Sequence, residues 1–274
     1  MRFPNRVASL LAVASLLVGG CAPQQGGSPA AQPTGASQTP LDPTDSPMPA
    51  TSPTPTVPTA PPTESTSPMP PRQQLPTGFS YVTDLAPTIR VELRYATAHN
   101  FTGAVVPGYE STTAAILRTP AAKALAKAQA TLADQGLTLL IYDAYRPTQA
   151  VAAFVKWSQN SDQSTKAEFY PKVAKKDLFR QGYIATRSQH SLGSTVDLTI
   201  VGTNGEPLDM GGPFDLFDPR SHYRASGLTA EQTRNRTLLR QTMQANGFAA
   251  YDTEWWHFTH SGSVTGTGQN FPVR

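Results

Sequence analysis

The sequence predicts one α+β domain over residues 79–274, with a central, mostly antiparallel sheet flanked by helices, preceded by a disordered tether. Short runs with strand periodicity recur through the second part of the chain, and longer runs with helical periodicity separate them. The tether is indicated by proline, because 16 of the 26 prolines fall between residues 22 and 77, among Ser, Thr and Ala. Such a segment lacks the apolar side chains that offset the entropy cost of ordering a chain.

The first half of the domain is expected to hold strands over residues 79–83 and 89–95, a turn over 100–103, a helix over 119–135 and a strand over 137–142. Thr119 and Pro120 suit an N-cap and first helical position, and Gly136 suits a helix stop. Residues 137–142 form a continuous apolar run, which predicts a central strand buried on both faces.

The second half is expected to hold a helix over residues 148–158, a strand over 195–201, an irregular stretch over 209–222, a helix over 230–245 and a last strand over 253–259. Thr229 and Gln232 have the spacing of a capping box, and Gly247 follows the helix as its stop. Residues 159–187 are polar and predict only a loop with a short helix.

The N-terminus predicts export with a lipid anchor. Arg2 and Arg6 precede an apolar run over residues 7–18, which is too short to span a bilayer, and small residues then lead to Cys21. Residues 1–20 are therefore expected to be a lipoprotein signal peptide, with residues 21–78 tethering a lipidated Cys21 to the domain outside the cytoplasmic membrane of a bacterium. The alternative is an ordinary secretory signal with an incidental cysteine, but Cys21 is the only cysteine and has no disulfide partner.

Charge argues against a nucleic-acid partner. The formal net charge is +3, and removing a segment with Arg2 and Arg6 leaves 3 − 2 = +1. A nearly neutral protein has no electrostatic footprint for nucleic acid.

Two segments carry the candidate chemistry. His190, Asp197 and His257 can hold a zinc ion on three sides and leave a fourth position open, as catalytic zinc sites do. Glu254 lies three residues before His257 and could take a proton from water held there. A flat strand would point these two side chains to opposite faces, so the strand must be bulged or must end there. Taken alone, each motif has an ordinary alternative, such as a core histidine or packing tryptophans.

Arg146 is the candidate for stabilising an oxyanion, because it follows the buried strand over residues 137–142. A surface salt bridge is the alternative from its local sequence.

Together these segments resemble the D-alanyl-D-alanine dipeptidases, the zinc family that includes the vancomycin-resistance dipeptidase. The matching pieces cover most of the domain, in order, at residues 95–97, 100–103, 108–110, 143–147, 188–191, 197–199, 214–215, 220–222, 247–248, 254–257 and 271–273. The resemblance implies one Zn²⁺ per chain, at one end of the sheet, bound by His190, Asp197 and His257. It further implies Glu254 as the general base for a metal-activated water and Arg146 as the stabiliser of the transition state.

The resemblance also implies that Tyr109, Asp143, Ser188 and Asp215 line a pocket for the dipeptide D-Ala-D-Ala, with Asp215 meeting its free amine. Gln189 and Thr195 depart from the residues usual in the family and border this pocket. Two other functions remain open. One is a D,D- or L,D-carboxypeptidase acting on peptidoglycan stem peptides, and the other is a zinc-containing wall-binding module without turnover.

Overall fold

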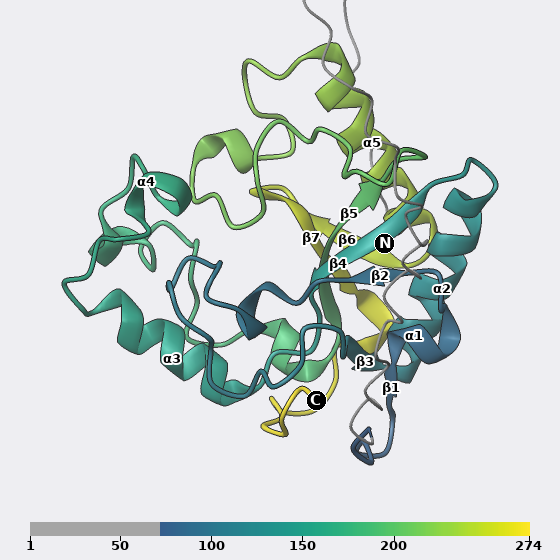
Figure 1. The fold of residues 1–274 in the computed structure, drawn as a ribbon, viewed down its shortest axis with the longest axis horizontal. Coiled ribbons are helices and arrows are strands. Elements are labelled where there is room, and N and C mark those ends of the chain that lie inside the picture. Colours follow the sequence, from purple (N-terminus) through teal and green to yellow (C-terminus); the bar gives the residue numbers. More distant parts are fainter. Residues whose placement is uncertain (1–71) are drawn as a thin grey trace, which may run out of the picture. The chain divides into compact units, whose positions relative to one another are not determined.

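The computed structural model describes residues 72–274 (Figure 1), so the expected signal peptide, Cys21 and most of the tether lie outside the described residues. Within residues 72–274, no helix is both long enough and apolar enough to cross a membrane. Ordered contacts begin shortly before Phe79, since Leu75 packs against the core and the Gln73 side-chain amide donates to the Pro272 carbonyl.

A five-stranded sheet in the order β2-β4-β5-β7-β6 forms the centre of the domain. Its strands are β2 (Arg90–Val91), β4 (Thr138–Asp143), β5 (Thr195–Val201), β6 (Phe248–Tyr251) and β7 (Glu254–His260). Only β2 and β4 pair in parallel, and all other neighbours are antiparallel. The prediction of a mostly antiparallel central sheet is therefore confirmed. Strands β1 (Phe79–Tyr81) and β3 (Ile116–Arg118) form a separate antiparallel pair.

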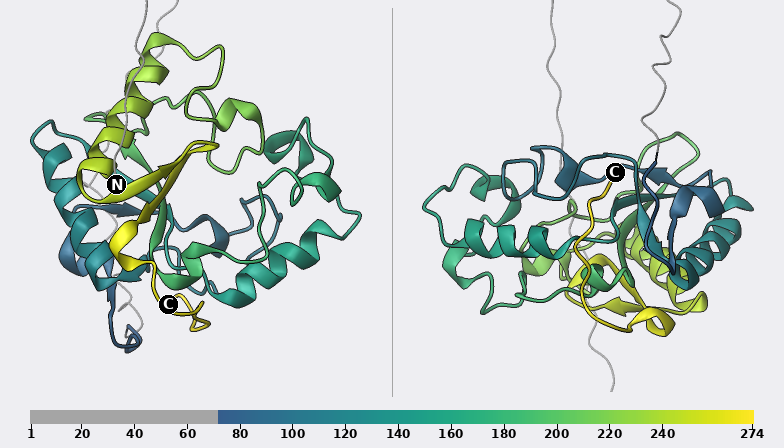
Figure 2. Two further views of the ribbon diagram at one scale, coloured as in Figure 1. Left: turned by 180° about the vertical axis from the view of Figure 1, so that it is seen from behind. Right: turned by 90° about the horizontal axis from the view of Figure 1, so that it is seen from below.

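Helices lie on both sides of the sheet. They are α1 (Val82–Leu85), α2 (Thr119–Ala133), α3 (Thr148–Ser158), α4 (Lys166–Phe169) and α5 (Ala230–Ala245), with 3₁₀ turns η1 (Arg94–Ala96), η2 (Lys175–Asp177), η3 (Gln189–Leu192), η4 (Pro219–Ser221) and η5 (Ser261–Ser263). Figures 1 and 2 show α2 and α5 together on one side of the central strands, with α3 and α4 on the other. The capping box before α5 is present, because Thr229 and Gln232 bond each other's backbone N–H.

The first predicted strands are shorter than expected. β1 ends at Tyr81, where α1 begins, and β2 ends at Val91. The Leu93 amide donates to the Thr112 carbonyl, so the chain leaves β4 and turns into η1. Thr119 does not cap α2, since it is the first helical residue and its hydroxyl bonds Ser80 at 2.8 Å. Strands β3 and β6 are not anticipated from the sequence.

The hydrophobic core contains the central strands β4 and β5 together with side chains from α2 and from α3, such as Phe154, as the continuous apolar run of β4 predicts. Residues Leu139 to Tyr142 of β4 are buried, and all seven residues of β5 are buried as well. In α2 the buried side chains include Leu125 and Leu132, which are seven residues apart and therefore share a helix face. Each such leucine contributes about 1.5–3 kcal/mol by leaving water. This packing fixes the sheet on which the polar residues described below are placed.

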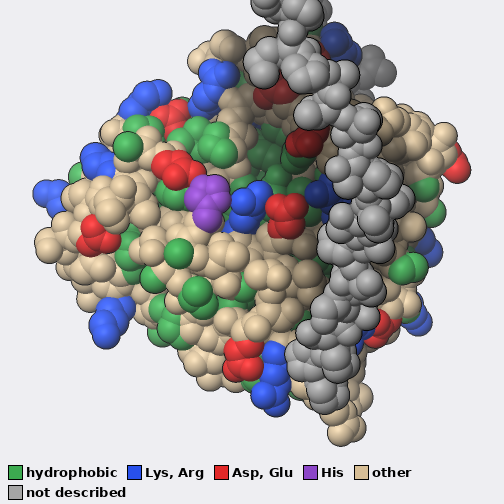
Figure 3. Space-filling view, viewed as in Figure 1, with side chains coloured by type: hydrophobic (Ala, Val, Ile, Leu, Met, Phe, Trp, Pro, Cys, Tyr) green, Lys and Arg blue, Asp and Glu red, His purple; other side chains and the backbone are tan. Residues whose placement is uncertain are grey.

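On the face seen in Figure 3, acidic and basic side chains are interspersed rather than gathered by sign. A hollow in the upper middle of the same view is lined by hydrophobic side chains.

Candidate active site

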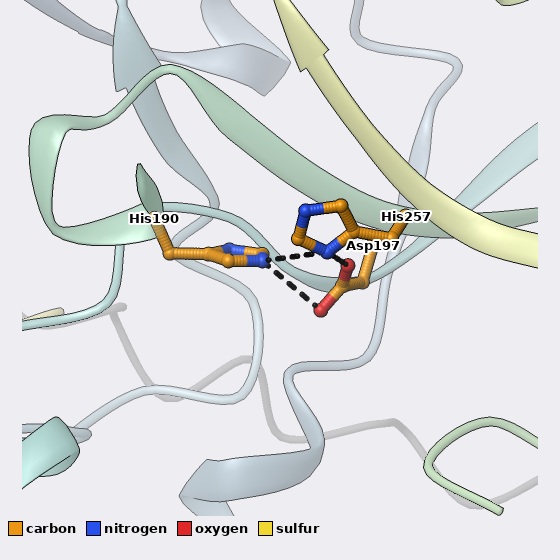
Figure 4. Close-up of side chains that lie close together, drawn as sticks. All are labelled: His190, Asp197 and His257. Carbon is orange, nitrogen blue, oxygen red and sulfur yellow. Dashed lines mark hydrogen bonds and ion pairs between the residues drawn. The ribbon is translucent and has the colours of Figure 1, made fainter. Parts of the chain in front are cut away.

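Three potential metal ligands meet at neighbouring strands (Figure 4). His190 comes from η3, Asp197 from β5 and His257 from β7, where Asp197 and His257 are directly paired in the sheet. His190 Nε2 lies 3.3 Å from Asp197 Oδ2 and 3.4 Å from His257 Nδ1. His257 Nδ1 lies 3.0 Å from Asp197 Oδ1. The three ligand atoms all lie within 4.8 Å of one another, which brings the predicted set together.

The turn that carries His190 is built by its neighbours. The Ser188 hydroxyl accepts from the His190 amide at 3.2 Å, which caps η3. Gly193 ends η3 with φ at 72°, and a Cβ there would lie 2.4 Å from the Phe79 ring. The His190 Nδ1–H donates to the Ala144 carbonyl at 2.7 Å. This bond fixes the tautomer and leaves the Nε2 lone pair directed at the other two ligands.

The donor set fits a divalent metal of the zinc type. Asp197 Oδ1 is buried and, within residues 72–274, has no assigned hydrogen-bond partner, although His257 Nδ1 lies 3.0 Å away. Burial opposes ionisation of Asp197, but His190 and His257 together hold its pKa below the usual range. An ionised carboxylate and two imidazole nitrogens that face one another can share one divalent cation. Zinc favours these nitrogen and oxygen ligands.

Glu254 reaches the same point despite its spacing from His257. Its Oε2 lies 3.5 Å from His257 Nδ1. Glu254 is the first residue of β7, and the pairing with β6 shifts register where Tyr251 meets Glu254. The irregularity required by the sequence is therefore present. Burial raises the pKa of Glu254 to about 7, although the neighbouring His257 acts in the opposite direction.

Arg146 lies at the edge of the ligand cluster and is only 13% exposed, so it is not a surface salt bridge. Its Nε and Nη2 donate to Asp143 Oδ2 at 2.9 and 2.8 Å, and Nη2 lies 3.5 Å from Asp197. The guanidinium also stacks over the rings of Tyr95 and Phe154, at 5.0 and 5.2 Å from their centroids. These contacts fix one orientation of the charge.

Two residues assigned to the pocket lie beneath it. Asp143 is fully buried and accepts from the Tyr109 hydroxyl at 2.6 Å as well as from Arg146. Neither Asp143 nor Tyr109 lines the cavity that contains the ligands. Both therefore act on the site by holding Arg146. Desolvation by burial raises the pKa of Asp143, with Arg146 and His190 acting to lower it.

Asp215 does line the cavity. It is 5% exposed and accepts from the Tyr95 hydroxyl at 2.8 Å. Burial, reinforced by the charge of Asp197, raises its pKa well above the usual value. Asp215 is also the one described non-glycine residue with positive φ, at 61°, a conformation that costs energy. Tyr95 was not assigned a role from the sequence, because nothing local connects it to a carboxylate 120 residues away.

The cavity around these groups measures about 630 Å³. Besides the ligand cluster, its lining includes Arg146, Tyr183, Arg187, Ser188, Gln189, Asp215, Tyr251, Glu254, Trp256 and Val264. A larger cavity of about 850 Å³ lies beside α3 and contains none of the candidate ligands. The ligand cavity is therefore the candidate active site.

Comparison with known families settles the relationship. The model of a family described as D-ala-D-ala dipeptidase matches residues 76–272. The chain belongs to this family. The resemblance inferred from the sequence, and with it the prediction of a dipeptidase-family enzyme, is confirmed.

Curated relatives agree with the family assignment. The D-alanyl-D-alanine dipeptidase of Streptomyces coelicolor is 46% identical over 184 residues, covering 66% of this chain and 90% of that protein. The dipeptidase of Enterococcus faecium is 40% identical, with 66% of this chain and 90% of that protein covered. Among solved structures, a vancomycin-resistance D,D-pentapeptidase in complex with Zn(II) overlaps at a TM-score of 0.28 and 15% identity, covering 55% of this chain and 75% of that one.

Proposed function

We propose that this protein hydrolyses the dipeptide D-Ala-D-Ala to two D-alanines, using one zinc ion per chain. The observation that carries the proposal is the convergence of His190, Asp197 and His257 beside a buried Glu254, in one cavity. Membership of the D-ala-D-ala dipeptidase family and the named relatives support the substrate.

His190 Nε2, Asp197 and His257 Nδ1 would hold the zinc. When bound, zinc lowers the pKa of water and polarises a carbonyl. The Ala144 carbonyl supports the ligand set by keeping the proton of His190 on Nδ1.

Glu254 acts as the general base. Its carboxylate takes a proton from the attacking water and passes it to the leaving nitrogen. A pKa of about 7 places it where both protonation states are populated near neutral pH, which suits a group that accepts and returns a proton. Its position 3.5 Å from a ligand nitrogen keeps the carboxylate within reach of the reacting atoms.

Arg146 stabilises the negative charge that forms on the carbonyl oxygen during attack. The Asp143 carboxylate and the Tyr95 ring hold its guanidinium in place before substrate binds. A preorganised charge of this kind stabilises the transition state without reorganising during the reaction.

Asp215 recognises the free amine of the dipeptide. Its buried carboxyl has one hydroxyl partner, Tyr95, and an ammonium group would supply the missing positive charge. An acylated amine offers no such charge, and it leaves the carboxyl buried without a counter-ion. The site therefore favours a dipeptide with a free amine over a stem peptide.

We further propose that the protein is exported and anchored by lipid on Cys21, on the evidence of the leader sequence. In a bacterial host, radiolabelled palmitate should be incorporated into the full chain and not into a Cys21→Ser variant. Label retained by the variant would refute this anchor.

Hydrolysis is tested with the purified full chain and zinc, by measuring D-alanine released from D-Ala-D-Ala, from N-acetyl-D-Ala-D-Ala and from a stem pentapeptide. We expect rapid release from the free dipeptide, abolished by Glu254→Ala and unchanged by Glu206→Ala, an exposed glutamate away from the cavity. Preference for the pentapeptide would instead establish a wall carboxypeptidase. Zinc binding without turnover of any substrate would leave a binding module.

A further inference from the structure

The substrate proposed for the candidate active site has charges of both signs, and the cavity must offer a partner to each. Asp197, Asp215 and Glu254 all line the cavity. A dipeptide with free ends carries a carboxylate as well as an ammonium group. Because the proposed zinc would face the attacking water and the scissile carbonyl, the terminal carboxylate needs a separate basic partner.

Arg146 is not free to provide that cation. Its Nε and Nη2 donate to Asp143, and Nη2 also approaches Asp197. Its charge is therefore matched by two buried carboxyl groups. In the proposed reaction it faces the carbonyl oxygen rather than the end of the substrate.

Arg187 is the other arginine that lines the cavity. It is exposed, and within residues 72–274 its guanidinium has no hydrogen-bond or ion-pair partner. By contrast, Arg180 on the same segment lies 3.2 Å from Asp177 and does not line the cavity.

We propose that Arg187 binds the C-terminal carboxylate of the substrate and is a specificity-determining residue. This inference rests on the proposed function, whose substrate has a free carboxylate. A planar guanidinium can hold a carboxylate through two parallel hydrogen bonds, which fixes its direction as well as its position.

Arg187 and Asp215, each binding one end of the substrate, would together restrict the class of substrate. An amine bound at Asp215 and a carboxylate bound at Arg187 require both free ends to lie in one cavity. A peptide extended at either end carries one of these charges farther along its chain, away from the residue that would bind it. Arg187 would therefore disfavour chains that continue beyond the second residue.

The first test compares D-Ala-D-Ala with its C-terminal amide, using the full chain with zinc. We expect Arg187→Met to lower kcat/KM for the acid by roughly 10- to 100-fold, mainly through KM, as for loss of a charged hydrogen bond. Hydrolysis of the amide, already slow, should not change further. Arg187→Lys should recover part of the loss, and Arg180→Met should behave as the unsubstituted chain.

The second test does not depend on turnover. Calorimetry on the zinc-loaded Glu254→Gln chain measures binding of D-Ala-D-Ala and of its amide, with and without Arg187→Met. We expect the second substitution to weaken binding of the acid by a similar factor and to leave binding of the amide unchanged.

The two tests separate failure of the inference from failure of the proposed function. If the chain hydrolyses D-Ala-D-Ala, but Arg187→Met changes kcat/KM and binding equally for the acid and the amide, the role of Arg187 is overturned. The same holds if Arg187→Met changes neither. A chain that binds the acid through Arg187 without hydrolysing it overturns the proposed reaction alone. No binding of either compound overturns both.

Discussion

Glu254→Gln is expected to abolish activity and, at the same time, to stabilise the metal-free fold above neutral pH. Burial raises the pKa of Glu254 from 4.5 to about 7, a rise of about 7 − 4.5 = 2.5. At about 1.36 kcal/mol for each pKa unit, this corresponds to about 3 kcal/mol. The value is an upper figure, because the side chain is 13% exposed and keeps some contact with water.

The direction of the effect follows from the pH at which the Glu254 carboxyl releases its proton in the folded and in the unfolded protein. Below pH 4.5 the carboxyl is neutral in both the folded and the unfolded protein, so it has no effect on unfolding. As pH rises past 4.5 the unfolded chain ionises first, and stability falls until the folded carboxyl ionises near 7. Glutamine does not ionise and avoids this loss.

The assay is thermal unfolding of the chelator-treated protein at pH 8 and at pH 4.5. We expect the variant to melt about 6–12 °C above the parent at pH 8, given about 2–4 °C per kcal/mol for a domain of this size. The difference should largely disappear at pH 4.5, and Glu206→Gln should show none at either pH. A Glu254→Gln variant that is no more stable at pH 8, or equally stabilised at both pH values, would refute the assigned burial of this carboxyl.

Four other substitutions have defined outcomes. His190→Ala should weaken zinc binding by more than about 100-fold, measured by chelator competition, and zinc retained after dialysis would contradict its role as a ligand. Asp143→Asn should lower kcat by about 100-fold with zinc content unchanged, because Arg146 loses its anchor, and a change in zinc content alone would contradict this. Asp215→Asn should narrow the preference for D-Ala-D-Ala over its N-acetyl derivative by roughly 10-fold, measured as a ratio of kcat/KM values, and an unchanged ratio would remove Asp215 from amine recognition. Leu125→Ala should lower the free energy of unfolding by about 2–5 kcal/mol in a urea titration, with a smaller loss showing that the core can collapse around it.

The elements that could be predicted from sequence are those with a strong local signal. The apolar run of β4, the alternation of β5 and the capping box of α5 each dictate their own structure. Strand β2 could not be bounded, because its end is set by a hydrogen bond from Leu93 to Thr112, outside the strand. The short β3 and β6 have too few residues to show a period.

The candidate site likewise has features that the sequence predicts and features that only the fold reveals. The ligand types and the need for an irregular strand at Glu254 follow from residue identity and spacing alone. Contacts between distant segments do not, such as the Tyr95 hydroxyl on Asp215. For the same reason the sequence predicts Asp143 in the pocket, whereas the fold buries it under Arg146.

The register of the sheet has a consequence for folding. Asp143, Asp197 and His257 occupy one row across β4, β5 and β7, one residue from each strand. A slip of one residue in either pairing would turn the slipped strand's side chains to the opposite face and break the row. Because Asp197 and His257 are the two strand-borne ligands, zinc would bind tightly only where β5 and β7 are correctly paired, and its binding energy would favour that pairing over a slipped one. The ion proposed for catalysis would thus also stabilise the correct strand register during folding.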